Sequence, residues 1–408
     1  MEFTLSQSFL VQKERFLQID ALLQRHVSLW QGMPFDCLDL PWRASHPELC
    51  QWLDLLCLKE LQAYKESPER LAETVKAWLP EAAQLVSLCG TEVETQNRPE
   101  IHCDSHIATG IPGRKWSQIT AFNSAIPLSN KGAWLEWCAG KGYLGRVISA
   151  TRQVGVTSLE WQEALCQDGQ AYANQHQLPM HFVHGDAFSP ESELLVSHCD
   201  HAVALHACGD LHVTLLRHSV KAKPQSLSVS PCCYHLINEV YYQPLSIVAT
   251  GSLLSLSRHD LKLPLQETVT AGKTVRNKRI VEVSFRLGFD SLQRALGHSD
   301  SYLPVPNIQK SLLNEGFEAF CRWAADKKGI SIPDNTDFAA FLSQGEQRFS
   351  TVEKMETIRT LFRRPLEMWL VLDRALFLSE NGFDVDVTTF CARELTPRNL
   401  LIQATRKG

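Results

Sequence analysis

Residues 136–145, EWCAGKGYLG, carry the residue types and spacing that point most directly to ligand chemistry. The last six fit the pattern G-x-G-x-x-G, in which glycines let backbone N–H groups and the positive end of a helix approach a phosphate or a carboxylate. Glu136 stands at the head of the string, where it would repel a dinucleotide pyrophosphate but suits an ammonium group. S-adenosylmethionine presents an ammonium beside a carboxylate, so the string favours this ligand over a nicotinamide dinucleotide.

Two further acids follow strand-like runs downstream. Glu160 comes twenty residues after Gly140, at a position where a carboxylate can bind the ribose hydroxyls of either cofactor. Asp186 lies in the string HGDAF after the next strand-like run and is placed to accept a hydrogen bond from an adenine amino group. A structural role for Asp186, and a glycine turn without any ligand, remain the alternatives.

Two polar strings follow the fourth and fifth strand-like runs: HACGDLH at residues 206–212 and PCCYH at residues 231–235. Open α/β sheets bind ligands at the carboxyl ends of their strands, so both strings are expected to line the pocket. An enzyme that transfers a methyl group must hold the acceptor atom about 3 to 3.5 Å from that group. His206 or Asp210 could accept a proton from a hydroxyl nucleophile.

The remaining members of the second string have less defined roles. Tyr234 or His235 could orient the acceptor or stack on a base. Cys232 and Cys233 are interpreted either as catalytic or as small buried residues near the cofactor. Thiols and imidazoles also resemble soft metal ligands, but no C-x-x-C occurs, and adjacent cysteines are expected to diverge. The sequence therefore predicts no metal site.

The elements that must position these residues form an alternating pattern. Short apolar strands alternate with amphipathic helices from residue 115 to 237, which predicts a parallel sheet covered on both faces. The expected strands are 133–137, 156–159, 181–183, 202–205 and 227–230, and the expected helices are 115–125, 142–151, 163–175 and 213–220. Near the end, a helix at 366–378 precedes strands at 383–390 and 399–404, which are close enough to form an antiparallel hairpin.

The rest of the chain is interpreted as additions to this sheet. With 408 residues the chain exceeds one average domain. We expect a helical region at 1–100, a cofactor-binding core at 101–240, an insertion at 241–364, and a closing segment at 365–408. Residues 97–113 are expected to be the linker between the first two. Within the insertion we expect a strand at 279–285 and helices around 308–325 and 352–362.

Composition limits the class of protein. The net charge is -5, so no overall attraction to nucleic acid or anionic membrane follows, although residues 258–286 carry seven basic side chains against three acidic ones. Thirteen scattered cysteines suggest reduced thiols. No run of eighteen apolar residues and no signal-peptide pattern occurs, so we expect a cytoplasmic protein without membrane contact.

The order of these motifs resembles the class I S-adenosylmethionine-dependent methyltransferases. Three strings narrow the resemblance to the methyltransferase-like protein 25 family: ALHACGDLHVTLLRH, SVSPCCYHL and the ending LDRALFLSENGF to LTPRNLLIQATR. A more distant similarity is to tRNA 2'-O-methyltransferases of the acceptor stem. The resemblance implies a Rossmann-like seven-stranded α/β sheet with a helical N-terminal region and an insertion after strand five.

The resemblance also implies a cofactor site for S-adenosyl-L-methionine. Its residues would be Lys115, Gln118, Glu136, Cys138, Ala139, Gly140, Gly142, Glu160, Trp161, Asp186, Ala187, Leu205 and His206. Lys115 or Gln118 would reach the methionine carboxylate, and Cys138 replaces the first glycine of the commoner loop. The implied activity is methyl transfer to an acceptor of unknown class, with RNA (tRNA) slightly favoured over protein or a small molecule. A NAD(P)-binding oxidoreductase and a catalytically inactive binding module of the same fold are the alternatives.

Overall fold

The computed structural model describes residues 7–90, 103–266, 273–309 and 311–407. The chain divides into two compact units. Unit 1 comprises Met1–Arg25, Ser87–Glu267 and Arg363–Gly408, and unit 2 comprises His26–Val86 and Thr268–Phe362. These boundaries differ from the four segments expected from the sequence, because both the N-terminal region and residues 241–364 contribute to both units. Of the expected linker at 97–113, residues 97–102 lie outside the described residues.

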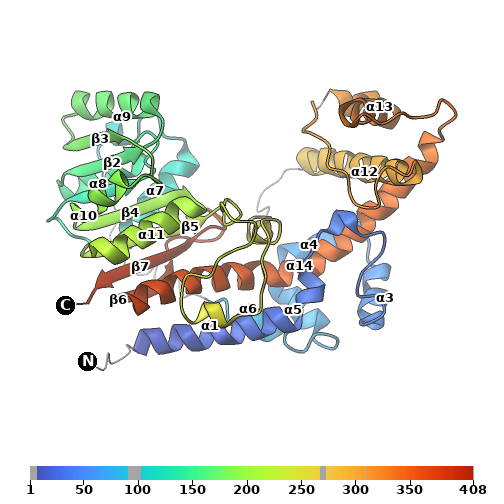
Figure 1. Cartoon of the computed structure of the whole chain (residues 1–408), viewed down its shortest axis with the longest axis horizontal. Coiled ribbons are helices and arrows are strands. Elements are labelled where there is room, and N and C mark those ends of the chain that lie inside the picture. Colours follow the sequence, from blue (N-terminus) through green and yellow to red (C-terminus); the bar gives the residue numbers. More distant parts are fainter. Residues whose placement is uncertain (1–6, 91–102, 267–272, 310, 408) are drawn as a thin grey trace. The chain divides into compact units, whose positions relative to one another are not determined.

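Unit 1 is built on a seven-stranded sheet of order β3-β2-β1-β4-β5-β7-β6 (Figure 1). The strands are β1 (Trp134–Trp137), β2 (Val156–Glu160), β3 (Met180–His184), β4 (His201–Cys208), β5 (Ser226–Cys232), β6 (Phe383–Thr389) and β7 (Leu400–Arg406). Strands β1 to β5 pair in parallel, and β7 pairs antiparallel with both β5 and β6. The predicted α/β sheet and its closing hairpin are confirmed.

Helices cover both faces of this sheet (Figure 1). Helices α7 (Gly113–Ala125), α8 (Tyr143–Arg152) and α9 (Glu163–Gln175) lie over one face, and α10 (Glu191–Ser197) and α11 (Asp210–Ala222) lie over the other. Trp134 and Val203 belong to the core beneath α7 and α8. Because side chains alternate along a strand, Trp137 faces the opposite layer, where its indole donates to the carbonyl of Leu211 at 2.9 Å. The sheet is therefore buried on both sides, as its apolar strands predict.

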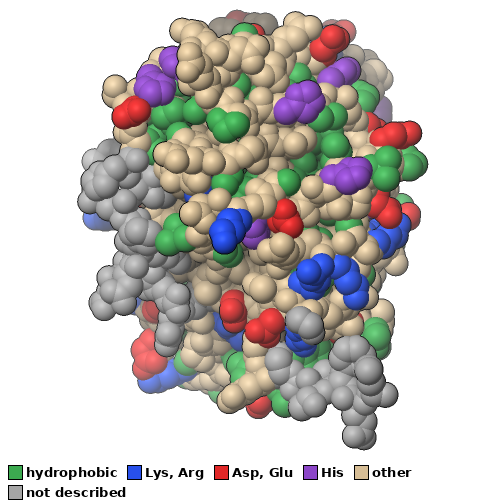
Figure 2. Space-filling model, turned by 90° about the vertical axis from the view of Figure 1, so that its left-hand side faces the viewer, with side chains coloured by type: hydrophobic (Ala, Val, Ile, Leu, Met, Phe, Trp, Pro, Cys, Tyr) green, Lys and Arg blue, Asp and Glu red, His purple; other side chains and the backbone are tan. Residues whose placement is uncertain are grey.

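Figure 2 shows the side of unit 1 that is on the left in Figure 1, where the arrow of β7 ends. Histidine side chains stand out on this face, and Lys and Arg are interspersed with Asp and Glu. This face therefore mixes charges of both signs.

The remaining parts of unit 1 are α1 (Gln7–Arg25), residues 233–266 and the end of α14 (Phe338–Glu380). The fully buried Asp373 of α14 fixes residues 242–246, because its carboxylate accepts from the hydroxyl of Tyr242 at 2.6 Å and from the backbone N–H of Ser246 at 2.8 Å. Short 3-10 helices lie at Ser105–Ala108, Ala249–Gly251 and Asp260–Leu265. Residues 241–266, expected in an insertion, thus belong to the unit that carries the sheet.

Unit 2 is helical. Its helices are α2 (Val27–Trp30), α3 (Pro47–Leu55), α4 (Leu58–Glu66), α5 (Pro68–Val75), α12 (Lys273–Ala295), α13 (Phe317–Lys328) and the first part of α14, with 3-10 turns at Pro34–Asp36 and Leu312–Glu315; α6 (Ala82–Ser87) lies at its boundary. The predicted strand at 279–285 is wrong, since these residues lie inside α12. Ile280, Val281 and Val283 favour a strand, but Phe285, Phe289 and Leu292 recur at helical spacing and pack into the core with α13.

Helix α14 joins two predicted helices into one. The patterns at 352–362 and 366–378 both lie within it, and Pro365 stands in its interior. A proline removes one backbone donor and usually ends or kinks a helix, which is why the sequence suggested a boundary there. No helix in the described ranges combines the length and apolar character needed to cross a bilayer.

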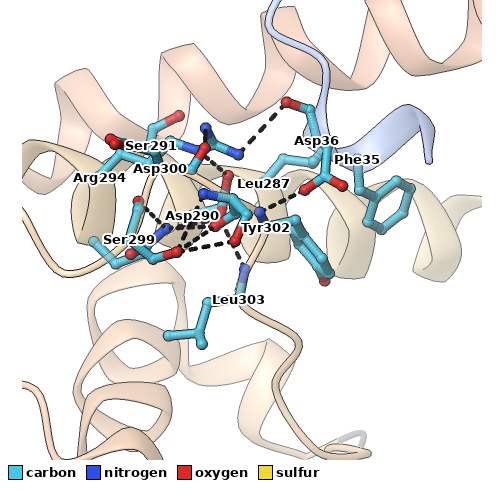
Figure 3. A network of polar contacts seen from close by, with 12 residues as sticks. Phe35, Asp36, Leu287, Asp290, Ser291, Arg294, Ser299, Asp300, Tyr302 and Leu303 are labelled. Atoms are coloured by element: carbon cyan, nitrogen blue, oxygen red, sulfur yellow. Dashed lines mark hydrogen bonds and ion pairs between the residues drawn. The ribbon is translucent and has the colours of Figure 1, made fainter. Parts of the chain in front are cut away.

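A buried carboxylate organises the polar interior of unit 2 (Figure 3). Asp290 of α12 is 0% exposed and forms 2.7 Å ion pairs with Arg294 and Arg348. Arg348 also donates to the carbonyl of Phe35 at 2.7 Å, so one network connects α12 and α14 with the Pro34–Asp36 turn. Burial of these charges is tolerable because each is paired and hydrogen-bonded.

We predict that Asp290→Ala lowers the free energy of unfolding by about 3 to 5 kcal/mol, because it leaves Arg348 buried without its anionic partner. Urea denaturation followed by circular dichroism measures the change. Asp326→Ala is the matched control, since the Asp326 side chain is 78% exposed and its ion pair with Lys327 is long, at 3.6 Å. Equal stability of the two variants would contradict an organising role for Asp290.

Candidate active site

The loop from β1 to α8 adopts a tight left-handed turn. Cys138, Gly140 and Gly142 have φ values of 56°, 59° and 68°. A Cβ at Gly142 would lie 2.3 Å from Cζ of Phe182, so only glycine fits there. A Cβ at Gly140 would meet nothing within 4 Å, so this side of the loop faces open space. The N–H of Ala139 donates to the carbonyl of Leu159 at 2.9 Å, which fixes the loop to β2.

Glu136 lies beneath this loop and is engaged by protein donors. Its carboxylate accepts from Ser158 Oγ at 2.9 Å and from the backbone N–H groups of Leu144 and Gly145 at the start of α8. Burial raises the pKa of Glu136 to about 7, against the lowering effect of these hydrogen bonds and of the Lys115 charge. Contact of this carboxylate with a ligand ammonium group, as expected from the sequence, stays a prediction.

Two carboxylates line a cavity of about 430 Å³ at the carboxyl ends of the strands. Glu160 accepts from the N–H of Gly140 at 2.8 Å and from that of Gln162 at 3.0 Å, and Asp186 accepts from the N–H of Phe188 at 2.9 Å. The residues lining the cavity are Cys138, Leu159, Glu160, Trp161, Gln162, Gly185, Asp186, Ala187, Phe188 and Leu211. These hydrogen bonds to backbone N–H groups hold both carboxylates in place. Each carboxylate still has lone pairs that can accept hydrogen bonds from a ligand in the cavity.

The structure brings together five residues predicted for the cofactor site, namely Cys138, Glu160, Trp161, Asp186 and Ala187. Sequence reasoning missed the other five. One signal was available for Phe188. It follows Asp186 within two residues, as the predicted Trp161 follows Glu160, and the two side chains are 49% and 66% exposed. Large apolar side chains left exposed beside carboxylates indicate a surface that binds a flat, partly polar ligand.

The predicted residues of α7 lie outside the cavity lining. The Lys115 ammonium lies 4.6 Å from the ring centre of Tyr143, and partial burial lowers its pKa. The amide of Gln118 donates to the carbonyl of Leu395 at 3.4 Å, a carbonyl that also accepts from Arg114 at 2.9 Å. These residues therefore contact the loop before β7 and the start of α8.

The end of β4 carries a bulge. The pairing register of β4 with β5 shifts between Leu205 and Cys208, and His206 between them has a φ of 72°. Leu205 is partly buried, whereas His206 is exposed at the edge of the sheet. Desolvation by the surrounding loops and the positive charges of Lys115 and Arg398 lower the pKa of His206, which favours its neutral form.

The residues at 231–235, at the end of β5 and just after it, differ in burial. The predicted role of Tyr234 in orienting the acceptor or stacking on a base is not supported, because Tyr234 is 0% exposed and its hydroxyl donates to Glu367 of α14 at 3.3 Å. His235 is partly buried. Asp210 begins α11 and accepts from the N–H of Asn238 at 2.7 Å. The sulfur atoms of Cys208, Cys232 and Cys233 all lie within 4.8 Å of one another.

Comparison with known proteins assigns a domain to this region. Residues 114–240 match the family model described as "Methyltransferase domain". One similar solved structure is an O-methyltransferase family protein from Burkholderia thailandensis, at 9% identity and a TM-score of 0.27, covering 84% of this chain and 72% of that one. Another is coclaurine N-methyltransferase bound to N-methylheliamine and SAH, at 13% identity and a TM-score of 0.26, covering 78% of this chain and 94% of that one. The matched residues include both cavity acids, so the cavity lies in the region that is similar to this family model.

We predict that Glu136 makes stability depend on pH between about 4.5 and 7. With its pKa raised from 4.5 to about 7, the folded protein holds a proton that the unfolded chain releases. The stabilisation is therefore complete below pH 4.5 and is lost as pH rises toward 7. Glu136→Gln removes this dependence. Between pH 4.5 and pH 8 the wild type should therefore lose up to about 3 kcal/mol of unfolding free energy that the variant retains. The exposed Glu163→Gln serves as control in urea titrations across this range, and parallel pH profiles of all three proteins would contradict the prediction.

Proposed function

We propose that this protein is an S-adenosylmethionine-dependent methyltransferase. The observation that carries the proposal is the pair of carboxylates, Glu160 and Asp186, on one cavity of about 430 Å³ inside the methyltransferase domain. Carboxylates at successive strand ends suit the hydroxyls and amino group of an adenosine. The exposed rings of Trp161 and Phe188 supply apolar area on the same cavity.

The residues present fit the cofactor group by group. Glu160 has acceptor capacity for ribose hydroxyls, and Asp186 for the adenine amino group. The open side of Gly140 lets the loop backbone approach a ligand without a side chain between them. Glu136 fixes β1, β2 and the first turn of α8 beneath that loop, so we assign it a positioning role. We retain Lys115 as the candidate cation for the methionine carboxylate.

S-adenosylmethionine supplies an electrophilic methyl group on a sulfonium. The task of the chain is then to align an acceptor with that group and to take up any proton the acceptor loses. His206 suits the second task, because its lowered pKa keeps a nitrogen free to accept a proton near neutral pH. Asp210 is the alternative base, although one of its oxygens already accepts from the backbone of Asn238.

For the acceptor we favour RNA over protein or a small molecule. In unit 2, Lys278 and Arg279 are exposed on the first turns of α12. In unit 1, Lys262 is exposed, whereas Arg258 donates to the carbonyls of Asn238 and Glu239. Exposed cations of this kind suit phosphate contacts. The side chains of Lys273 and Arg276 are not among those that the structure describes. Of the basic residues at 258–286, the proposal therefore uses only Lys262, Lys278 and Arg279.

Two alternatives make different predictions about ligands. A NAD(P)-binding oxidoreductase would bind a pyrophosphate at the β1–α8 loop, close to the carboxylate of Glu136, which is repulsive when ionised. A catalytically inactive methyltransferase fold would act as a binding module without cofactor uptake. Calorimetry with S-adenosylmethionine and with NADH distinguishes these three functions directly.

We predict that the wild-type protein binds S-adenosylmethionine, and that Glu160→Gln weakens binding by about 10- to 100-fold, because a charged acceptor for the ribose is lost. Glu163→Gln, on the exposed first turn of α9, should leave the affinity unchanged. Isothermal titration calorimetry measures both, and circular dichroism verifies the fold of each variant. Binding of NADH but not of S-adenosylmethionine would contradict the proposal.

We further predict that methyl label from S-adenosylmethionine enters the RNA fraction of the host when the protein is incubated separately with RNA, protein and small-molecule fractions. The Glu160→Gln variant gives the background of each fraction. Label found only in protein, or only in small molecules, would exclude RNA as the acceptor and leave the assignment of the cofactor intact.

A further inference from the structure

Three thiols meet at the carboxyl ends of β4 and β5. The sulfur atoms of Cys208, Cys232 and Cys233 lie within 4.8 Å of one another, and Cys208 Sγ is 3.6 Å from Cys232 Sγ. With Zn–S bonds of about 2.3 Å, two sulfurs of a tetrahedral zinc site lie about 3.8 Å apart. The spacing of the cluster therefore approaches that of a zinc site without movement of the backbone.

The backbone produces this convergence by two departures from regular strand geometry. The bulge at His206 shifts the register so that Cys208 pairs with Cys232. Cys233 has a φ of 48°, in the left-handed region that a non-glycine residue rarely adopts. In an extended strand, adjacent side chains point to opposite faces. The turn at Cys233 removes that divergence, which was one of the two reasons to expect no metal from the sequence; the other was the lack of a C-x-x-C motif.

A fourth ligand is available two residues further on. Nδ1 of His235 is buried and has no hydrogen-bond partner. An imidazole nitrogen that is buried without a partner costs free energy unless a donor, a water molecule or a metal engages it. Among the described residues, the ring nitrogens of His206 and His235 lie outside the 4.8 Å group of sulfurs, so the side chain of His235 must rotate to complete the set.

We propose that Cys208, Cys232, Cys233 and His235 bind one zinc ion. Three thiolates and an imidazole are a ligand set typical of structural zinc sites, and soft sulfur ligands select zinc over the hard cations magnesium and calcium. Binding releases the thiol protons to solvent. The ion would tie the end of β4 to the end of β5 beside the cavity. This proposal goes beyond the methyltransferase function and does not rest on it.

The rival for the same atoms is a disulfide between Cys208 and Cys232. Both are free thiols in the structure, and their sulfurs are closer to each other than a tetrahedral pair requires. A disulfide leaves Cys233 without a role in the cluster. The zinc site, in contrast, requires all three sulfurs at once. Substitution of Cys233 should therefore abolish zinc binding but leave a Cys208–Cys232 disulfide possible.

We predict that the full-length protein, purified under reducing conditions without chelators, holds about one zinc per chain by mass spectrometry of the metal. Cys208→Ser, Cys232→Ser and Cys233→Ser should each lose most of this zinc. Cys199→Ser is the matched control, because Cys199 is also a buried thiol but lies just before β4, at the amino ends of the parallel strands. His235→Ala should retain zinc but release it faster to a chromophoric chelator.

Cobalt substitution of the wild-type protein provides a measurement that does not depend on whether the variants fold. We expect the absorption spectrum to show thiolate-to-cobalt charge-transfer bands, with the intensity that three sulfur ligands produce. The proposal is overturned if the reduced wild-type protein takes up neither zinc nor cobalt, or if Cys199→Ser loses the metal as the cluster variants do. It is also overturned if oxidised glutathione, added with zinc present, converts Cys208 and Cys232 to a disulfide while it is itself reduced to glutathione.

Discussion

A buried carboxylate at the end of β1 fixes the loop on which the candidate site depends. Glu136 is 4% exposed, and taking a carboxylate out of water is costly unless hydrogen bonds replace the lost solvent. Ser158 on β2 and the first turn of α8 supply them, so one side chain connects two strands and a helix. A Cβ at Gly145 would lie 2.6 Å from this carboxylate, which shows how closely α8 approaches it. The cavity acids lie at neighbouring strand ends, where Glu160 ends β2 and Asp186 follows β3, and Glu160 accepts from the N–H of Gly140 in the loop above Glu136.

Left-handed backbone recurs at the ends of three strands. Cys138 after β1, His206 in β4 and Cys233 after β5 are non-glycine residues with φ values of 56°, 72° and 48°. Each such residue costs on the order of 1 kcal/mol, and such residues cluster at functional sites. Cys138 lines the cavity, and the sulfur of Cys233 lies within 4.8 Å of those of Cys208 and Cys232. Two of these three turns therefore carry a thiol of the cavity or of the sulfur cluster.

The sequence predicted the sheet well because its signals are local. Apolar runs mark each strand, and parallel strands place their carboxyl ends at one edge, so Glu160 and Asp186 could be brought together without a structure. Tyr234 could not be placed, because its burial depends on Glu367, far away in the chain. The strand expected at 279–285 failed because β-branched residues in α12 outweighed the helical spacing of its core residues. The sulfur cluster depends on a bulge that no residue pattern marks.

Unit 2 is assembled from two stretches of chain, His26–Val86 and Thr268–Phe362, with most of unit 1 between them in sequence. The network of Asp290 includes the carbonyl of Phe35 in the first stretch and the guanidinium of Arg348 in the second. During synthesis, the helices of the first stretch leave the ribosome long before their partners exist. Their apolar faces stay without the helices of the second stretch until residue 362 has emerged. The helical unit therefore cannot be completed before residues 87–267 of unit 1 have been synthesised, and apolar surface that is exposed during this interval favours aggregation.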